Sequence, residues 1–272
     1  MQNKKIGLFD TAFIVSTILF LGLTGYWLFI FLTGSTSGAL NDNFGFLYGG
    51  LSVWAGIWGL VTAYQWGGLK SLMGKALIFL SVGLLFQGFG QYSFWFFNVF
   101  LHVEIPYPGV PDIGYFGSIP FYIIAAYQLF RVSGTKFTLR ANSGKIRAIL
   151  VPLLMLGLGY TLFLRGYTFD WSDPLKIFLD FGYPLGQAVY ISFAIITYTL
   201  SRKLLGGKMR MPFLILIAAF IAQFVADYSF LYFQETFFAG SFIDYIYLLS
   251  YALMTLGILY FRYVAKQIKH SS

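Results

Sequence analysis

The charge-free stretches of this sequence constrain its fold more than any other feature. Eight stretches contain no Asp, Glu, Lys or Arg. Each one reaches the roughly 20 residues of a membrane-spanning helix, either alone or with its flanking residues. They are residues 11–41, 43–69, 76–103, 113–130, 148–164, 181–201, 211–226 and 245–261. Only 10% of the 272 residues are charged, whereas soluble domains carry about 25%. A soluble core of this size cannot hide so much apolar surface, so lipid is the expected solvent.

We therefore predict an all-α, polytopic integral membrane protein with about eight spans. The expected helices are 8–32, 44–66, 73–100, 111–131, 147–165, 174–201, 211–234 and 242–264. Two alternatives change this number. A cleavable signal peptide has an apolar core of about 7–15 residues and a small-residue cleavage site, which the long run 11–41 does not match. A seven-span protein leaves the segment between Arg147 and Arg165 out of the membrane.

Basic residues alternate between the predicted loops and indicate the orientation. With both termini in the cytoplasm, 16 of the 18 basic residues fall on the inner side, and only Arg165 and Lys176 fall outside. Nine of the ten acidic residues lie on or near the outer side, with Asp10 the exception. Lys and Arg accumulate in cytoplasmic loops, so we expect a multi-pass protein of the cytoplasmic (inner) membrane. The net charge of +8 is then a topology signal, and we expect no nucleic-acid partner.

An internal duplication is suggested by matching polar positions. Residues 87–94 (QGFGQYSF) and 223–230 (QFVADYSF) share Gln, Tyr, Ser and Phe at an offset of 136. The match resumes at an offset of 132, where the Asp-x-x-Tyr segments 112–115 and 244–247 correspond. The second and sixth expected helices also align loosely around a tyrosine, at positions 48 and 183.

This pattern predicts two copies of a four-helix unit, residues 1–136 and 137–272, within one continuous membrane domain. Because four is an even number, both copies enter the membrane in the same direction, and an axis along the membrane normal relates them as a parallel repeat. The alternative is coincidence in an apolar chain of low complexity.

Polar residues near the outer helix ends form a candidate site. Asp-x-x-Tyr occurs three times there, and residues i and i+3 share a helical face. Asp227 is the deepest acidic residue, and ionisable groups within membranes usually face the bundle interior or a wet cavity. We expect an outward-facing polar pocket for a cation, a proton or a small polar ligand. The candidate ligand-binding residues are Gln87, Gln91, Asp112, Tyr115, Asp180, Tyr183, Gln187, Gln223, Asp227, Asp244 and Tyr247.

A purely structural interpretation of the same residues stays open. Asp112, Asp180 and Asp244 sit near helix N-termini, where a carboxylate is stabilised by about 0.3–1 kcal/mol, and act as caps. The Gln and Tyr residues then bond neighbouring helices, at about 0.6 kcal/mol each. Tyr107 and Tyr167 belong in this interpretation to an aromatic belt at the outer interface.

The residue inventory argues against catalysis and cofactor binding. The chain has no cysteine, so it has no zinc-thiolate site, iron–sulfur site or thiol nucleophile. Its two histidines, His102 and His270, lie outside the expected spans, which excludes an intramembrane bis-histidine haem. No spacing matches a phosphate-binding loop or a metalloprotease. We expect no metal, no cofactor and no catalytic residues.

A family resemblance adds to this interpretation. Residues 106–112 (PYPGVPD), followed by Tyr115 and Pro120, resemble the Pro-Tyr-Pro-Ser-x-Ala-Asp stretch of a bacterial multi-helix membrane module. Residues 87–95 and 180–185 look similar as well, while Gly109 and Pro111 replace the usual Ser and Ala. In that family the module commonly precedes a diguanylate cyclase (GGDEF) domain or a histidine kinase. We expect no output domain after residue 272, so the resemblance implies a sensory module that signals through a separate cytosolic protein.

Four functions follow as hypotheses. A membrane sensory or ligand-binding module combines the resemblance with the outward polar residues, and its small ligand or ion is unknown. A small secondary transporter or proton-coupled carrier suits the repeat and Asp227. An intramembrane enzyme that acts on lipid lacks a set of nucleophile, base and metal. An assembly subunit needs the polar residues only for stability.

Overall fold

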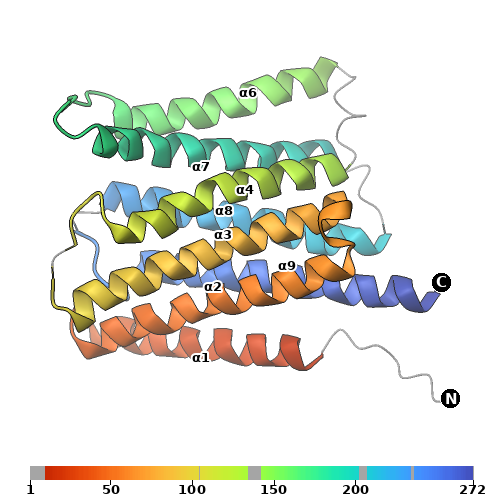
Figure 1. Cartoon of the computed structure of the whole chain (residues 1–272), viewed down its shortest axis with the longest axis horizontal. Coiled ribbons are helices and arrows are strands. Elements are labelled where there is room, and N and C mark those ends of the chain that lie inside the picture. Colours follow the sequence, from red (N-terminus) through yellow and green to blue (C-terminus); the bar gives the residue numbers. More distant parts are fainter. Residues whose placement is uncertain (1–9, 104, 134–141, 202–206, 234–235, 272) are drawn as a thin grey trace.

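The computed structural model describes residues 10–103, 105–133, 142–201, 207–233 and 236–271, and this part of the chain is all-α (Figure 1). Its long helices are α1 (Thr11–Thr33), α2 (Ala39–Gln65), α3 (Leu72–Trp95), α4 (Val110–Val132), α6 (Asn142–Gly159), α7 (Pro174–Ser201), α8 (Arg210–Phe233) and α9 (Phe242–Ser271). In the described residues, eight helices are long and apolar enough to cross a membrane. This confirms the predicted number of spans over the seven-span alternative and makes a lipid bilayer the partner of their apolar surfaces.

Short helical turns adjust the ends of these helices. The π-helical turns η2 (Phe96–Phe100) and η3 (Tyr160–Leu164) extend α3 and α6 to their full membrane length. The 3₁₀ turns η1 (Gly68–Lys70) and η4 (Gly207–Met209) precede α3 and α8. The last five residues of these two spans, η2 and η3, therefore follow a π-helical rather than an α-helical path.

Three helix boundaries differ from the sequence prediction by five residues or more. α6 begins at Asn142, five residues before the expected residue 147. α2 begins at Ala39, five residues before the expected residue 44, because the polar side chain of Asn41 finds partners inside the protein. Its amide donates to the carbonyl oxygens of Ser35 at 3.0 Å and Ala239 at 2.6 Å. α9 continues to Ser271, beyond the expected residue 264. The expected helix start at residue 8 and helix end at residue 234 lie outside the described residues.

Six helices pack in a closed ring. Neighbours contact one another in the cyclic order α2, α3, α4, α7, α8, α9 and back to α2. α1 lies outside this ring against α2 and α9, and α6 lies outside it against α7 (Figure 1). In the apolar 18-residue stretch of α1 and of α6 that could cross a membrane, only 6% is buried, against 44–56% in the corresponding stretches of the six ring helices. The two outer helices therefore present most of their apolar side chains to lipid.

Small residues allow close packing within the ring. A Cβ atom added to Gly114 of α4 would lie 2.3 Å from the backbone nitrogen of Gly90 and 2.5 Å from the carbonyl oxygen of Phe86, both on α3. Only glycine fits there, as expected where two membrane helices bring their backbones together. This contact fixes the distance between α3 and α4, which form one wall of the site described below.

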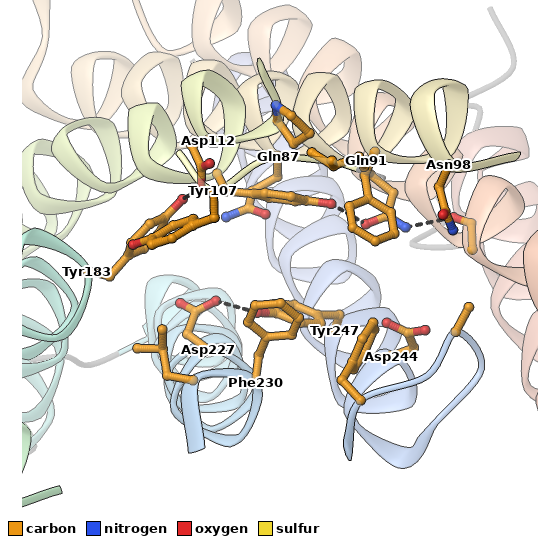
Figure 2. Close-up of a pocket in the computed structure, with 18 of the residues that line it drawn as sticks. Gln87, Gln91, Asn98, Tyr107, Asp112, Tyr183, Asp227, Phe230, Asp244 and Tyr247 are labelled. Carbon is orange, nitrogen blue, oxygen red and sulfur yellow. Dashed lines mark hydrogen bonds between the residues drawn. The ribbon is translucent and has the colours of Figure 1, made fainter. Parts of the chain in front are cut away.

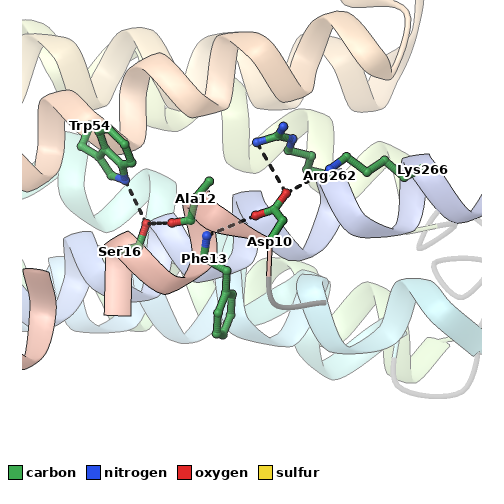
Figure 3. Close-up of polar contacts among 7 residues, drawn as sticks. All are labelled: Asp10, Ala12, Phe13, Ser16, Trp54, Arg262 and Lys266. Carbon is green, nitrogen blue, oxygen red and sulfur yellow. Dashed lines mark hydrogen bonds and ion pairs between the residues drawn. The ribbon is translucent and has the colours of Figure 1, made fainter. Parts of the chain in front are cut away.

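Polar contacts hold the outer helix α1 on the ring (Figure 3). Asp10 caps α1 by accepting from the backbone N–H of Phe13 at 3.2 Å. The same carboxylate lies 2.9 Å from Lys266 Nζ and 3.8 Å from Arg262 Nη1, both on α9. Trp54 of α2 donates to Ser16 Oγ at 2.8 Å. α1 thus depends on a few polar contacts as well as on apolar packing.

The helix directions define two ends of the bundle. α1 begins and α9 ends at the same end of the bundle (Figure 1). We call this the basic end, because η1, the last turn of α9 and the starts of α6 and α8 bring lysines and arginines there. The opposite end, where α2, α4, α7 and α9 begin, carries most of the acidic residues.

Candidate functional site

A cavity of about 700 Å³ lies within the six-helix ring, toward the acidic end. Its lining includes the exposed residues Asn98, Pro106 and Lys176, so the cavity opens at that end. Cavities of about 300–1,000 Å³ are typical of small-molecule sites. Figure 2 shows Tyr107, Gln87 and Gln91 on one wall facing Asp227, Tyr247 and Asp244 on the other.

The structure brings the candidate residues from the sequence together around this cavity. Ten of them line it: Gln87, Gln91, Asp112, Tyr115, Asp180, Tyr183, Gln187, Asp227, Asp244 and Tyr247. Gln223 does not line the cavity but donates to Asp227 Oδ1 at 3.0 Å from one helical turn away. The three Asp-x-x-Tyr pairs therefore face a common space, as their i, i+3 spacing predicts.

One hydrogen-bond network joins four helices around Gln91. The hydroxyls of Tyr48 (α2) and Tyr115 (α4) lie 3.0 and 2.9 Å from Gln91 Oε1 on α3. Tyr48 also lies 2.9 Å from Asp244 Oδ1 on α9, so its single proton serves one acceptor or the other. Asp244 Oδ2 accepts from the backbone N–H of Gly240 at 2.7 Å. Asp244 is therefore both a cap of α9, as predicted, and part of the cavity wall.

A second network surrounds Asp227 on α8. Tyr190 (α7) donates to its Oδ2 at 2.8 Å, and Tyr247 (α9) donates to its Oδ1 at 2.9 Å. Together with Gln223, three uncharged donors hold the carboxyl group of Asp227, a residue that is 6% exposed. Ser250 in turn lies 2.9 Å from Gln223 Oε1. Asp227 is thus fixed at the junction of three helices.

Gln87 connects the two walls of the cavity. Its Nε2 donates to Ser118 Oγ on α4 at 2.8 Å, and its Oε1 accepts from the hydroxyl of Tyr251 on α9 at 3.2 Å. Both bonds are buried, where an unpaired amide would be costly. This residue therefore ties α3 to α9 below the open part of the cavity.

Asp112 links α4 to α7 nearer the opening. Its Oδ2 accepts from the backbone N–H of Gly109 at 2.8 Å, which caps α4 as predicted. Its Oδ1 accepts from the hydroxyl of Tyr183 at 2.7 Å. One carboxylate thus ends a helix and also fixes a side chain of the cavity wall.

Asp180 corrects one sequence prediction. It lies in the second turn of α7, which begins at Pro174, so it is not a cap. Its carboxylate accepts instead from the hydroxyls of Tyr107 at 2.8 Å and Tyr167 at 2.7 Å. Both tyrosines therefore have a specific hydrogen-bond partner in the cavity wall, and their place in an aromatic belt stays a prediction. The hydrogen bond to Asp180 raises the pKa of Tyr167 to about 12, and burial together with the bond to Asp180 raises the pKa of Tyr107, so both phenols remain donors at neutral pH.

Two polar atoms in the cavity wall lack partners among the described residues. Gln187 Oε1 is buried and accepts no hydrogen bond there, although the residue is only 3% exposed. Trp95 Nε1 is likewise buried and donates to none of the described groups. Buried polar groups are nearly always paired, so these atoms are available to a bound molecule.

The charged residues of the cavity wall are mostly acidic. Five aspartates line the cavity, at positions 42, 112, 180, 227 and 244, and Lys176 is the single basic residue among the described lining residues. The ion pairs found between described residues both involve Asp10 at the other end of the bundle. In the described part of the chain, no three His, Cys, Asp or Glu side chains are grouped so as to hold a metal ion. The wall is therefore acidic without a built metal centre.

Several lining residues were not among the candidates from the sequence. Tyr48, Tyr107 and Tyr251 contact polar groups 43 to 196 residues away in the chain, and Asp42 lies in the early turn of α2 that was expected to be a loop. Two of them carried a signal: Tyr48 aligns with Tyr183 in the suspected repeat, and Tyr107 lies in the segment 106–112 that resembles the membrane module. Tyrosines at a membrane interface are otherwise too common to single out.

Comparisons with known proteins assign no family to the chain. No protein-family model, curated protein or solved structure matches it. The resemblance to the membrane module that precedes diguanylate cyclase and histidine kinase domains stays a prediction.

Proposed function

We propose that the chain is a membrane sensory module that binds a small ligand in its cavity from the outer side and relays binding to a separate cytosolic protein. The observation that carries the proposal is the cavity itself, open at one end and lined by five carboxyl groups and the unpaired Gln187 Oε1. Helices that served only for assembly would have no reason to surround such a space. Packed interiors rarely leave voids much larger than a water molecule.

The proposal includes a cytoplasmic location for the basic end. Ten described basic residues belong to that end: Lys70, Lys75, Arg131, Lys145, Arg147, Lys208, Arg210, Arg262, Lys266 and Lys269. Arg165 and Lys176 are the two at the acidic end. By the preference of Lys and Arg for the cytoplasmic side, both termini are inside and the cavity opens outward.

We also infer that the two halves of the chain are copies of one four-helix unit. Equivalent hydrogen bonds support this. Tyr48 donates to Asp244 at 2.9 Å, and Tyr183, 135 positions after Tyr48, donates to Asp112 at 2.7 Å, 132 positions before Asp244. The bonds join the second helix to the eighth and the sixth to the fourth, so each half supplies one partner to the other.

Two further pairs of contacts correspond in the same way. Tyr115 donates to Gln91 at 2.9 Å, and Tyr247 donates to Asp227 at 2.9 Å, with offsets of 132 for the tyrosines and 136 for the acceptors. Gln87 contacts Ser118 at 2.8 Å, as Gln223 contacts Ser250 at 2.9 Å, with the same two offsets. The outer positions of α1 and α6, the first and fifth spans, fit the same relation.

A route for the signal follows from α9. The first turns of this helix carry Asp244 and Tyr247 in the cavity, and its other end carries Arg262 and Lys266 against Asp10. A ligand that changes the contacts of Asp244 or Tyr247 therefore acts on a helix that reaches the cytoplasmic end. Such a ligand shifts the conformation only by as much as its affinity differs between the two states.

A thermal-shift screen of the purified full-length protein in nanodiscs tests the proposal. The panel comprises amines, amino acids, carboxylates, sugars and the divalent ions Ca²⁺, Mg²⁺ and Zn²⁺, each measured across pH. We expect at least one compound to raise the melting temperature in a concentration-dependent way. The shift should be lost in Asp112→Asn, Asp227→Asn or Asp244→Asn and kept in the control Asp170→Asn, an exposed residue outside the cavity. No shift across the panel would contradict the proposal.

A small secondary transporter is the second candidate, and Asp227 is the observation that favours it. A carboxyl group held between three membrane helices is a common ion or proton site in transporters, and parallel repeats are known in such proteins. Uptake into proteoliposomes that is abolished by Asp227→Asn would favour transport. Binding without uptake would favour the sensory module.

A further inference from the structure

We propose that the ligand of this cavity is an organic cation with N–H donors, a protonated amine or a guanidinium, carried on an apolar body. The inference rests on the proposed ligand-binding function and names the chemistry of its ligand. It follows from three properties of the wall: its charge, its one unpaired buried acceptor and its aromatic surface.

The donors that hold the carboxyl groups are all uncharged. Asp227 is held by two tyrosines and a glutamine, Asp180 by two tyrosines, and Asp112 and Asp244 each by one tyrosine and one backbone N–H. These bonds orient the oxygens but cancel no charge. None of the lining aspartates forms an ion pair with a described Lys or Arg, and Lys176 is exposed. Electrostatics therefore disfavour an anionic ligand and favour a cation.

The unpaired Gln187 Oε1 requires an N–H donor from the ligand. Tyr183, Gln187 and Tyr190 are spaced four and three residues apart, so they share one face of α7. Tyr183 contacts Asp112 and Tyr190 contacts Asp227. Gln187 therefore lies along α7 between the two tyrosines that hold these carboxyl groups, and like both carboxyl groups it lines the cavity. Its Oε1 is an acceptor without a donor among the described residues. An ammonium or guanidinium between these carboxyl groups satisfies it, whereas a quaternary ammonium has no N–H to give.

Aromatic side chains provide the remaining surface. Cations bind well over the faces of Trp, Tyr and Phe, and the same rings bury an apolar body. The aromatic residues of the wall include Trp95, Tyr107, Phe163, Tyr167, Phe230 and Phe237. A sugar or another polar neutral molecule can donate hydrogen bonds to the carboxyl groups but does not offset their charge.

A bare metal ion fits the site less well. Calcium requires about six to eight converging oxygen ligands and magnesium about six in octahedral geometry. The described carboxyl groups are not grouped in threes, and their oxygens already accept from tyrosines, a glutamine or backbone N–H groups. A cavity of about 700 Å³ also exceeds the space that one ion needs.

Matched probes test the charge and the donor separately. Dissociation constants are measured on the full-length protein in nanodiscs for phenethylamine, its neutral analogue 2-phenylethanol, its anionic analogue 3-phenylpropionate and its N,N,N-trimethyl derivative. A second series uses tryptamine with tryptophol and indole-3-propionate. We expect the amines to bind at least about tenfold more tightly than their alcohols, since one well-placed interaction of about 1.4 kcal/mol gives that factor, and the acids to bind least.

Variants locate the binding. Asp227→Asn and Asp112→Asn should each weaken amine binding at least about tenfold, with Asp170→Asn unchanged. Gln187→Leu should weaken phenethylamine but leave the trimethyl derivative unchanged. Unliganded melting temperatures show which variants fold, and Asp42→Asn at the opening serves if a deeper variant does not.

The outcomes separate this inference from the proposed function. If the alcohols bind as tightly as the amines, or if Asp227→Asn and Asp112→Asn leave amine binding intact, the cation assignment is wrong. Binding of a neutral or anionic panel compound that depends on cavity residues would still support a ligand site. If no compound of either series or of the broader panel binds, both inferences fail.

Discussion

The hydroxyl of Tyr190 on α7 lies 2.8 Å from Asp227 Oδ2 on α8, and both residues are buried. This contact shows how the ring holds its acidic groups, with neutral donors from neighbouring helices. The variants Asp227→Asn and Asp227→Ala should therefore differ. Asparagine keeps an acceptor oxygen, whereas alanine leaves Tyr190, Tyr247 and Gln223 without one.

We expect Asp227→Ala to lower the free energy of unfolding by roughly 1–3 kcal/mol more than Asp227→Asn, the cost of unsatisfied buried donors. Thermal or denaturant unfolding in detergent checks this. The matched pair Asp170→Asn and Asp170→Ala should differ less, because the donors that alanine would leave unpaired there, both on Ser172, are exposed to water. Equal effects of the two Asp227 variants would mean that the three donors find other acceptors.

The tyrosine contacts Tyr48–Asp244 and Tyr183–Asp112 should have similar strengths because they occupy corresponding places in the ring. Double-mutant cycles with Tyr→Phe and Asp→Asn should give a coupling energy of about 0.6 kcal/mol each, the average for side-chain hydrogen bonds in membranes. The exposed Tyr64 paired with Asp244 is the control and should give none. A coupling found in only one of the two cycles would count against the internal duplication.

The contact of Gly114 with α3 predicts a steric effect. Gly114→Ala places a Cβ atom 2.3 Å from the Gly90 nitrogen, and backbone atoms cannot rotate away. Overpacking of this kind costs about 1–3 kcal/mol, so the variant should melt at a lower temperature. Gly157→Ala on α6 is the control, since its Cβ would meet nothing within 4 Å, and it should be neutral or stabilising. A harmless Gly114→Ala would contradict the close packing of α3 and α4.

The contact of Asp10 with α9 predicts a dependence on pH and salt. Partial burial raises the pKa of Asp10. The hydrogen bond and charge of Lys266, the hydrogen bond from the Phe13 N–H and the charge of Arg262 lower it by more, so the net pKa lies below the ordinary 3.8. A carboxyl group with a lowered folded-state pKa stabilises the fold above its unfolded pKa. The contribution is therefore complete above about pH 5 and is lost as the pH falls through 3.8 toward the folded-state value.

Spin labels on α1 and α9 should accordingly separate below about pH 4 or in high salt, which screens exposed pairs. Asp10→Asn should show the wider separation already at neutral pH. Because asparagine is also a good N-cap, α1 itself should remain helical in that variant. A label distance that does not respond to pH, salt or the substitution would show that apolar packing alone holds α1.

The spans were predictable from the sequence, because hydrocarbon imposes a length on every apolar helix. The early start of α2 was not, since Asn41 and Asp42 read as loop residues until Ala239 provides a partner for Asn41. Helical spacing placed Asp112 with Tyr115 and Asp244 with Tyr247 on common faces. It gave no indication that Tyr183 binds Asp112 or that Tyr107 binds Asp180, because such partners depend on which helices become neighbours. The cyclic order of the ring depends on packing between helices, and the spacing of residues within each helix does not predict which helices become neighbours.

The opening of the cavity to the outer side is the central claim, and cysteine accessibility tests it most directly in a chain without native cysteines. Four single-cysteine variants are compared. Asn98→Cys and Ile105→Cys replace residues that line the cavity, Leu154→Cys replaces an exposed apolar residue of α6, and Lys70→Cys replaces a residue at the basic end. In intact cells, a membrane-impermeant thiol reagent should label the two cavity positions and neither of the others, and Lys70→Cys only after permeabilisation. Labelling of Lys70→Cys in intact cells, with the cavity positions labelled only after permeabilisation, would contradict the account.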